Sequence, residues 1–129
     1  MTTNKLTAQR VRDLLNYNPA TGIFTWRFTR GGKFAGSVAG TPRYREHRLI
    51  GWTEEGEEIL NEKVIQNIVI KIDGVLYTAS MLAWLYMTGR YPVGTIKRLE
   101  GDGSDNRWCN LRSRSIYDHR ENVRVPSFL

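Results

Sequence analysis

Arginine is the side chain of this sequence best suited to chemistry with anions. Fourteen arginines and five lysines stand against thirteen acidic residues, and the net charge is +6. A guanidinium group can bind a phosphate through two parallel hydrogen bonds, so the excess of arginine favours phosphate recognition. Residues 1–50 carry nine basic and two acidic side chains, residues 51–88 two and six, and residues 89–129 eight and five. Two basic segments that flank an acidic one predict a surface for a polyanion.

Composition limits the class of protein further. The 129 residues fit one domain, and 40% hydrophobic with 25% charged residues is typical of globular proteins. No apolar run approaches the roughly 18 residues that span a bilayer. The first residues also lack a signal-peptide core, so we expect a cytoplasmic protein without a membrane partner. Cys109 is the only cysteine, which excludes an internal disulfide and a zinc site built on cysteines.

The elements that position these side chains begin with a helix. Thr7 is placed to cap it, and its apolar residues repeat at helical spacing as far as Leu15. The segment 18–22 ends this helix, because Pro19 disfavours helical geometry in the residue before it. Residues 23–28 are rich in β-branched and aromatic side chains and predict a strand.

A β-hairpin over residues 67–78 is the clearest local signal. Its two halves meet at Asp73-Gly74, a dipeptide favoured in a type I′ turn. Ser80 can cap the helix that follows, which is apolar nearly all round and is therefore expected in the core. Gly89 fits the C-terminal cap of that helix.

The rest of the chain predicts small sheets and one more helix. Residues 95–99 and 110–112 are predicted as short strands around a turn-rich loop. A last helix, capped by Ser113 or Ser115, is predicted to run to Asn122. Residues 41–66 are interpreted as an inserted hairpin with an acidic tip. The predicted fold class is α+β, with an N-terminal helix, a β-hairpin and a buried helix ahead of the C-terminal strands and helix.

Several of these segments together carry a family resemblance. Leu-Ala-Trp-Leu-Tyr-Met-Thr-Gly at 82–89 and Gly-Asp-Gly-Ser-Asp-Asn-Arg-Trp-Cys-Asn-Leu-Arg at 101–112 resemble the phage-type HNH homing endonucleases. Tyr-Asn-Pro-Ala-Thr-Gly-Ile-Phe-Thr-Trp at 17–26 and Ala39-Gly40 are similar to the N-terminal part of the same family. The resemblance covers most of the chain except the insertion.

The resemblance implies a single HNH-endonuclease-like domain over residues 1–129, with 41–66 as an insertion and a ββα-metal unit over 95–122. Family members cleave or nick DNA with one divalent cation held in that unit. A histidine takes a proton from water beside a carboxylate that helps to hold the metal, a helix supplies a further ligand, and an asparagine braces the loop. Hydrolysis of a phosphodiester needs these groups to prepare the nucleophile and to stabilise the leaving oxygen.

This sequence departs from the family pattern at the first strand. Lys97-Arg98 stands where the family has Asp-His, and Glu100 replaces an asparagine. Ser80-Met81 stands where the family has His-Arg at the head of the buried helix. Asn110 keeps the bracing position, and His119 and Asn122 match the family's helix residues.

The departures predict a degenerate site at which no catalytic residue is assigned. Loss of a general base costs about 10²–10⁴ in rate. Arg98 cannot replace it because a guanidinium stays protonated. Lys97 would repel a divalent cation about 4 Å away by several kcal/mol at an effective dielectric constant near 20. No cofactor is expected, and His119 is the one candidate metal ligand.

The first hypothesis is therefore a DNA-binding protein of phage HNH ancestry that has lost its nuclease chemistry. Double-stranded DNA is the expected partner, because basic side chains can hold phosphates without a metal. The candidate contacts are Arg27, Arg30, Lys33, Lys97, Arg98, Arg107, Arg112, Arg114, Arg120 and Arg124.

Two alternatives stay open. One is an active nicking endonuclease with a site rebuilt from Glu100, Asn110 and His119 around Mg²⁺ or another divalent cation. The other is a phage protein that binds and modulates a host protein through residues 41–66, since plain DNA binding gives no use for an acidic excursion. Nicking of a plasmid, a salt-dependent gel shift and capture of a host protein distinguish the three.

Overall fold

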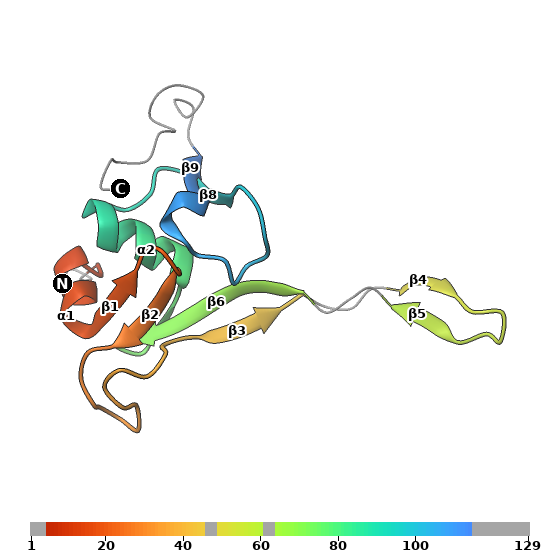
Figure 1. The fold of residues 1–129 in the computed structure, drawn as a ribbon, viewed down its shortest axis with the longest axis horizontal. Coiled ribbons are helices and arrows are strands. Elements are labelled where there is room, and N and C mark those ends of the chain that lie inside the picture. Colours follow the sequence, from red (N-terminus) through yellow and green to blue (C-terminus); the bar gives the residue numbers. More distant parts are fainter. Residues whose placement is uncertain (1–4, 46–48, 61–63, 115–129) are drawn as a thin grey trace.

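The computed structural model describes residues 5–45, 49–60 and 64–114. The protein is a mixed α+β fold with a rounded body and a narrow arm that projects from it (Figure 1). The helices are α1 (Ala8–Leu14) and α2 (Ala79–Thr88), with a short 3-10 turn, η1 (Trp108–Asn110). The strands are β1 (Leu15–Asn18), β2 (Ile23–Trp26), β3 (Thr41–Tyr44), β4 (Leu49–Trp52), β5 (Glu58–Leu60), β6 (Ile65–Ile72), β7 (Val75–Thr78), β8 (Thr95–Arg98) and β9 (Leu111–Arg114).

The first helix is capped as predicted, but it ends earlier than its apolar spacing indicates. The Thr7 hydroxyl accepts a hydrogen bond from the Arg10 backbone N–H at 3.1 Å. The chain then passes directly into β1, which pairs antiparallel with β2, so Leu15 lies opposite Trp26. The prediction of a helix through Leu15 is thus wrong: the apolar spacing of the helix continues to Leu15, but the backbone there pairs with β2 instead. The predicted strand 23–28 is confirmed as far as Trp26.

The Asp73-Gly74 hairpin is confirmed. Asp73 has φ of 51° and Gly74 of 81°, the left-handed pair that a type I′ turn requires. Strand β6 begins two residues before the predicted position and also pairs with β3, giving a three-stranded sheet in the order β3-β6-β7.

Helix α2 packs in the core as predicted and ends at Gly89, which has φ of 79° and donates its N–H to the Leu85 carbonyl. The predicted cap is wrong: Thr78 occupies the N-cap position, without a side-chain hydrogen bond, and Ser80 is buried within the helix. The core joins α1, α2 and β1–β2 to one face of the three-stranded sheet. Ile70 and Ile72 lie on that face and are almost fully buried.

The residues that alternate with these isoleucines along the strands point away from the core, because successive strand side chains lie on opposite faces of a sheet. These are Thr41 and Arg43 on β3, Val69 and Lys71 on β6, and Leu76, which lies opposite Lys71 on β7. No helix covers this open face in the described parts of the chain. Lys71, Arg43 and Leu76 are exposed there.

Strands β8 and β9 confirm the two short strands predicted near the C-terminus. They pair antiparallel, with Lys97 opposite Arg112 and Arg98 opposite Leu111, around a loop over residues 99–107. The predicted last helix, and with it His119, Arg120, Asn122 and Arg124, lies outside the described residues.

The arm is a second hairpin formed by β4 and β5 (Figure 1). The sequence predicted a hairpin with an acidic tip here, and Glu54, Glu55 and Glu57 do occupy its turn. The predicted insertion 41–66 also includes β3 and the start of β6, which belong to the sheet of the body. Among the described residues, no helix has both the length and the apolar character needed to cross a membrane.

Candidate nucleic-acid interface

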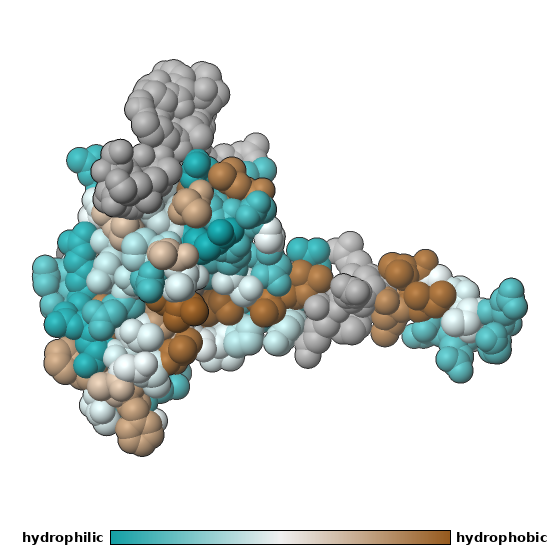
Figure 2. Space-filling view, viewed as in Figure 1, coloured by the Kyte–Doolittle hydropathy of each residue, from teal (hydrophilic) through white to brown (hydrophobic). Residues whose placement is uncertain are grey.

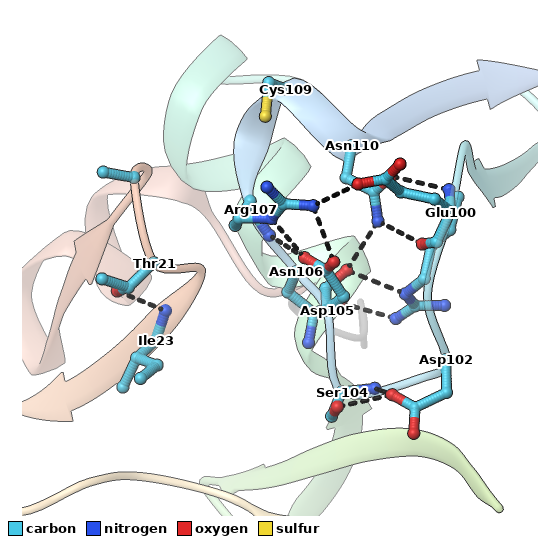
Figure 3. Close-up of polar contacts among 12 residues, drawn as sticks. Thr21, Ile23, Glu100, Asp102, Ser104, Asp105, Asn106, Arg107, Cys109 and Asn110 are labelled. Atoms are coloured by element: carbon cyan, nitrogen blue, oxygen red, sulfur yellow. Dashed lines mark hydrogen bonds and ion pairs between the residues drawn. The ribbon is translucent and has the colours of Figure 1, made fainter.

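Asn110 braces the loop between β8 and β9 from its centre (Figure 3). Its side-chain Oδ1 accepts from the Glu100 N–H at 2.9 Å, and its Nδ2 donates to the Glu100 carbonyl at 2.7 Å and to the Asp105 carbonyl at 3.2 Å. Asn110 is almost fully buried. Both ends of the amide are therefore used, which is the bracing role that the resemblance implies.

Arg98 binds the same loop from its own strand. Its Nε donates to the Asp105 carbonyl at 3.1 Å, and its Nη2 donates to the Gly103 carbonyl at 3.1 Å and to the Asn106 Oδ1 at 2.6 Å. Partial burial lowers the pKa of Arg98, against the opposing effect of Asp102 and Asp105. Arg98 thus lies beside Asn110, since both donate to one carbonyl, and its guanidinium holds backbone rather than facing solvent.

Arg107 is paired with two carboxylates of the loop, those of Glu100 and Asp105. Arg107 Nη2 lies 3.0 Å from Glu100 Oε1, and its Nε lies 2.8 Å from Asp105 Oδ1 (Figure 3). The hydrogen bond between Arg107 and Asp105 lowers the pKa of the Asp105 carboxyl and raises the pKa of the Arg107 guanidinium. The charge of Arg107 is therefore used within the loop, on two of its carboxylates.

Two glycines seat the loop against the rest of the body. Gly103 donates its N–H to the Ile65 carbonyl at 2.9 Å, and a Cβ at Gly103 would lie 1.9 Å from the Gln66 carbonyl oxygen. Gly22 has φ of 78°, and a Cβ there would lie 2.3 Å from the carbonyl carbon of Asn106. These contacts fix the loop between β6 and the turn that joins β1 to β2.

The residues of this loop do not fit a divalent cation. Glu100, the nearest replacement for the missing carboxylate, is bound to Arg107, and the two first-strand positions carry cations. Within the described part of the chain, no group of three or more His, Cys, Asp or Glu side chains is placed to hold a metal ion. His119, the predicted metal ligand, lies outside that part.

A different set of cations surrounds the open face of the three-stranded sheet. Arg30 and Lys33 stand on the loop 27–37, where their backbones exchange two hydrogen bonds of 2.8 Å. Lys33 and Lys71 line two adjoining surface hollows, one of which also includes Arg30 and the other Arg43. We call these four exposed residues, Arg30, Lys33, Arg43 and Lys71, the basic face.

No cation of the basic face forms an ion pair among the described residues, where the ion pairs involve Arg10 and Arg107. Asp73 borders the hollow that Arg30 lines and is bound to Arg10 at 2.8 Å; the Arg10 hydrogen bond is the main cause of its lowered pKa, and the nearby charge of Arg30 contributes. Trp26 and Leu76 line the hollows between the charges. The arrangement offers four exposed cations without an ion pair in the described structure, around a partly apolar floor, which suits an extended polyanion.

The structure separates the predicted DNA contacts into groups. Arg30 and Lys33 belong to the basic face, while Lys97 is exposed on β8, across the strand pair from Arg112. Arg27 donates to the Arg12 carbonyl at 2.6 Å, and Arg112 donates to the carbonyls of residues 109 and 111. Arg98 and Arg107 are bound within their loop, and the side chain of Arg114 lies outside the description together with Arg120 and Arg124.

Sequence reasoning missed Arg43 and Lys71. The signal was available in β6, where Asn67, Val69 and Lys71 alternate with the isoleucines of the core face. That alternation marks Lys71 as facing away from the core. The position of Arg43 depends on the pairing of β3 with β6, which no local pattern reveals.

Comparison with known proteins assigns no family. No protein-family model matches the chain, and neither does any curated protein or solved structure. The HNH resemblance therefore stays a prediction, and the functional argument rests on the residues and their geometry.

Proposed function

We propose that this chain is a double-stranded DNA-binding protein of phage HNH-endonuclease ancestry, and that it holds DNA by its phosphates without cleaving it. The observation that carries the proposal is the basic face. The basic face consists of exposed side chains around two adjoining hollows, and none of them forms an ion pair among the described residues: Arg30, Lys33, Arg43 and Lys71. Free cations that gather without counter-charges are the electrostatic footprint of a phosphate backbone.

The shape of the region agrees with this use. An antiparallel sheet that packs on a helix with one face leaves the other free to lie along a duplex, and strands are among the elements that enter DNA grooves. The sheet is rigid because β6 is held by strands on both sides. Cations on such a support lose little freedom on binding, which favours affinity.

The absence of cleavage is proposed from the first-strand residues. Hydrolysis needs a group that can accept a proton from water, and Arg98 remains charged and bound to three acceptors of its own loop. Of the carboxylates in this loop, Glu100 and Asp105 are both bound to Arg107, which competes with any metal cation for them. The strand pair that would carry nuclease chemistry is thus used to hold a loop together.

A neutralisation experiment tests the binding face. The triple variant Lys33→Gln, Arg43→Gln, Lys71→Gln should bind a 20-base-pair duplex roughly 100-fold more weakly, because each charged contact contributes about 1 kcal/mol or more. The matched control removes three exposed charges that are not among the proposed contacts, with Lys5→Gln, Arg45→Gln and Arg90→Gln. Equal losses in the two variants would mean that net charge, not this face, binds DNA.

A second assay tests the proposed lack of cleavage. Supercoiled plasmid is incubated with the wild-type protein and Mg²⁺ or Mn²⁺, with an EDTA control. The proposal expects the plasmid to stay supercoiled in every lane. Nicking that EDTA abolishes would show instead that the site has been rebuilt with its chemistry intact.

A further inference from the structure

The arm exposes apolar side chains with no core behind them. Leu49, Trp52 and Leu60 are 49%, 59% and 45% exposed. Leu49 pairs with Leu60, and Trp52, three residues further along β4, lies opposite Glu58. Figure 2 shows this apolar part of the arm on the side nearer the body and a hydrophilic tip beyond it. An isolated two-stranded hairpin is marginally stable in water, and a grouped apolar surface of this kind marks an interaction site.

The tip of the arm is a compact group of carboxylates. Glu54, Glu55 and Glu57 lie in the turn, and Glu58 begins β5. The turn is closed by hydrogen bonds between Thr53 and Glu57 and by Gly56, whose φ is 85°. Within the described residues none of these four carboxylates is in an ion pair. The tip therefore presents up to four negative charges on a narrow support.

One chain thus carries two surfaces of opposite charge, and neither forms an ion pair in the part of the chain that the structure describes. The four carboxylates of the tip equal the four cations of the basic face in number and are opposite to them in charge. Leu76 and Phe34, which are 48% and 71% exposed beside Lys71 and Lys33, offer apolar contacts for the arm as well. We propose that the occupant of the basic face is the arm of a second copy of this chain, so that two copies exchange arms and cover each other's DNA-binding surface.

The length of the arm is sufficient for this exchange. A stretch of ten residues, the number from Arg45 to Glu54, has a maximum length of ~33 Å when fully extended. A body of about 100 residues has a radius of gyration of ~13 Å, so the tip can cross a neighbouring copy. A two-fold axis would place both arms symmetrically, which is the commonest arrangement of identical subunits.

The exchange has a consequence for DNA binding. The glutamates of the tip occupy the positions that the phosphates would take, so a second copy and a duplex compete for the same cations. This consequence rests on the proposed function, whereas the arm exchange itself requires only the basic face. Association of the chain with itself should then fall with salt, because exposed ion pairs are screened.

A charge-swap experiment tests the arm exchange without DNA. Variant A carries Glu54→Lys, Glu55→Lys and Glu57→Lys, and variant B carries Lys33→Glu, Arg43→Glu and Lys71→Glu. Sedimentation of the full chain at 1–100 μM in low salt measures association; those concentrations bracket roughly micromolar affinity. We expect wild type to dimerise, each variant alone to dimerise at least tenfold more weakly, and an equimolar mixture of A and B to regain the dimer, because each arm then meets a face of opposite sign.

Three results would overturn the inference: a wild-type chain that stays monomeric throughout, variants that dimerise like wild type, or a mixture that fails to restore the dimer. Circular dichroism of each variant confirms that it is folded. Duplex binding is measured in parallel to separate the two proposals. Variant A keeps the basic face and should bind DNA at least as tightly as wild type. If it no longer dimerises but still binds DNA, only the competition of the arm with DNA has been lost. If variant B binds DNA as wild type does, only the proposed function is contradicted.

Discussion

Two groups of basic side chains in this protein have the same charge and different uses. Arg98, at the end of β8, and Arg107, in the loop between β8 and β9, donate hydrogen bonds to carbonyl and carboxylate oxygens of that loop. Lys33 and Lys71, on the basic face, point to solvent without such partners in the described structure. The difference teaches that a cation in a recognisable motif can be structural, while cations outside any motif remain available for a ligand.

The largest effect is expected where the loop is anchored to β6. Gly103→Ala would place a Cβ 1.9 Å from the Gln66 carbonyl oxygen, an overlap with backbone that cannot move aside. We expect the free energy of unfolding to fall by about 3 kcal/mol or more. Urea denaturation measures the loss, with Gly56→Ala as the control.

Gly56 has open space around it and a φ of 85°, so alanine there meets only backbone strain of about 1 kcal/mol. Equal stability of the two variants would mean that the loop is not held against β6, and the contrast between a fixed loop and a free basic face would fail.

The next effect concerns Arg98. Arg98→Met keeps an unbranched side chain but leaves the carbonyls of Gly103 and Asp105 and the Asn106 Oδ1 without this donor. We expect a loss of about 2–3 kcal/mol in the free energy of unfolding. DNA affinity of the folded variant should change less than about threefold, which corresponds to under 1 kcal/mol.

Lys97→Met is the matched control, because Lys97 is exposed on the same strand. Its stability should stay within about 0.5 kcal/mol of wild type. A drop in DNA affinity at Arg98 as large as that of the basic-face variant would assign the loop to the interface after all.

The smallest effect is a pH dependence. The pKa of Asp105 lies below its ordinary value because Arg107 donates to its carboxylate, and the pKa of Asp102 is lowered by hydrogen bonds from Ser104. A lowered folded-state pKa stabilises the fold above the unfolded pKa of about 4, and this stabilisation is lost as pH falls through the folded pKa. Thermal melting from pH 6 to pH 2.5 should therefore show a smaller acid-induced loss for Asp105→Asn than for wild type. A loss of the same size in both would show that this carboxylate is not coupled to folding.

Local signals account for the parts of the fold that the sequence predicts well. Asp73-Gly74, Thr7 and Gly89 each act within a few residues, and the structure has them as a turn, an N-cap and a C-cap. Strand β1 escaped prediction because Leu14 and Leu15 continue the helical spacing, and only pairing with β2 decides against it.

The site was harder to predict for the same reason. The partners of Arg98 are mainly carbonyls, and their positions depend on how the loop folds rather than on side-chain identity. Arg43 and Lys71 are brought to one face by β3 and β6, with the whole arm between them in the sequence. The hydrophobic and charge patterns predict elements and net charge, but they do not specify which cations remain free.

The salt dependence of DNA binding tests the central claim most directly. Fluorescence anisotropy with a labelled duplex, at several salt concentrations, gives the slope of log K against log [salt] for wild type and for Lys33→Gln, Arg43→Gln, Lys71→Gln. Each phosphate contact contributes about 0.9 to that slope, so we predict that the variant's slope is shallower by about 2.7. An unchanged slope would contradict the account, because the basic face would then make no contact with the phosphates.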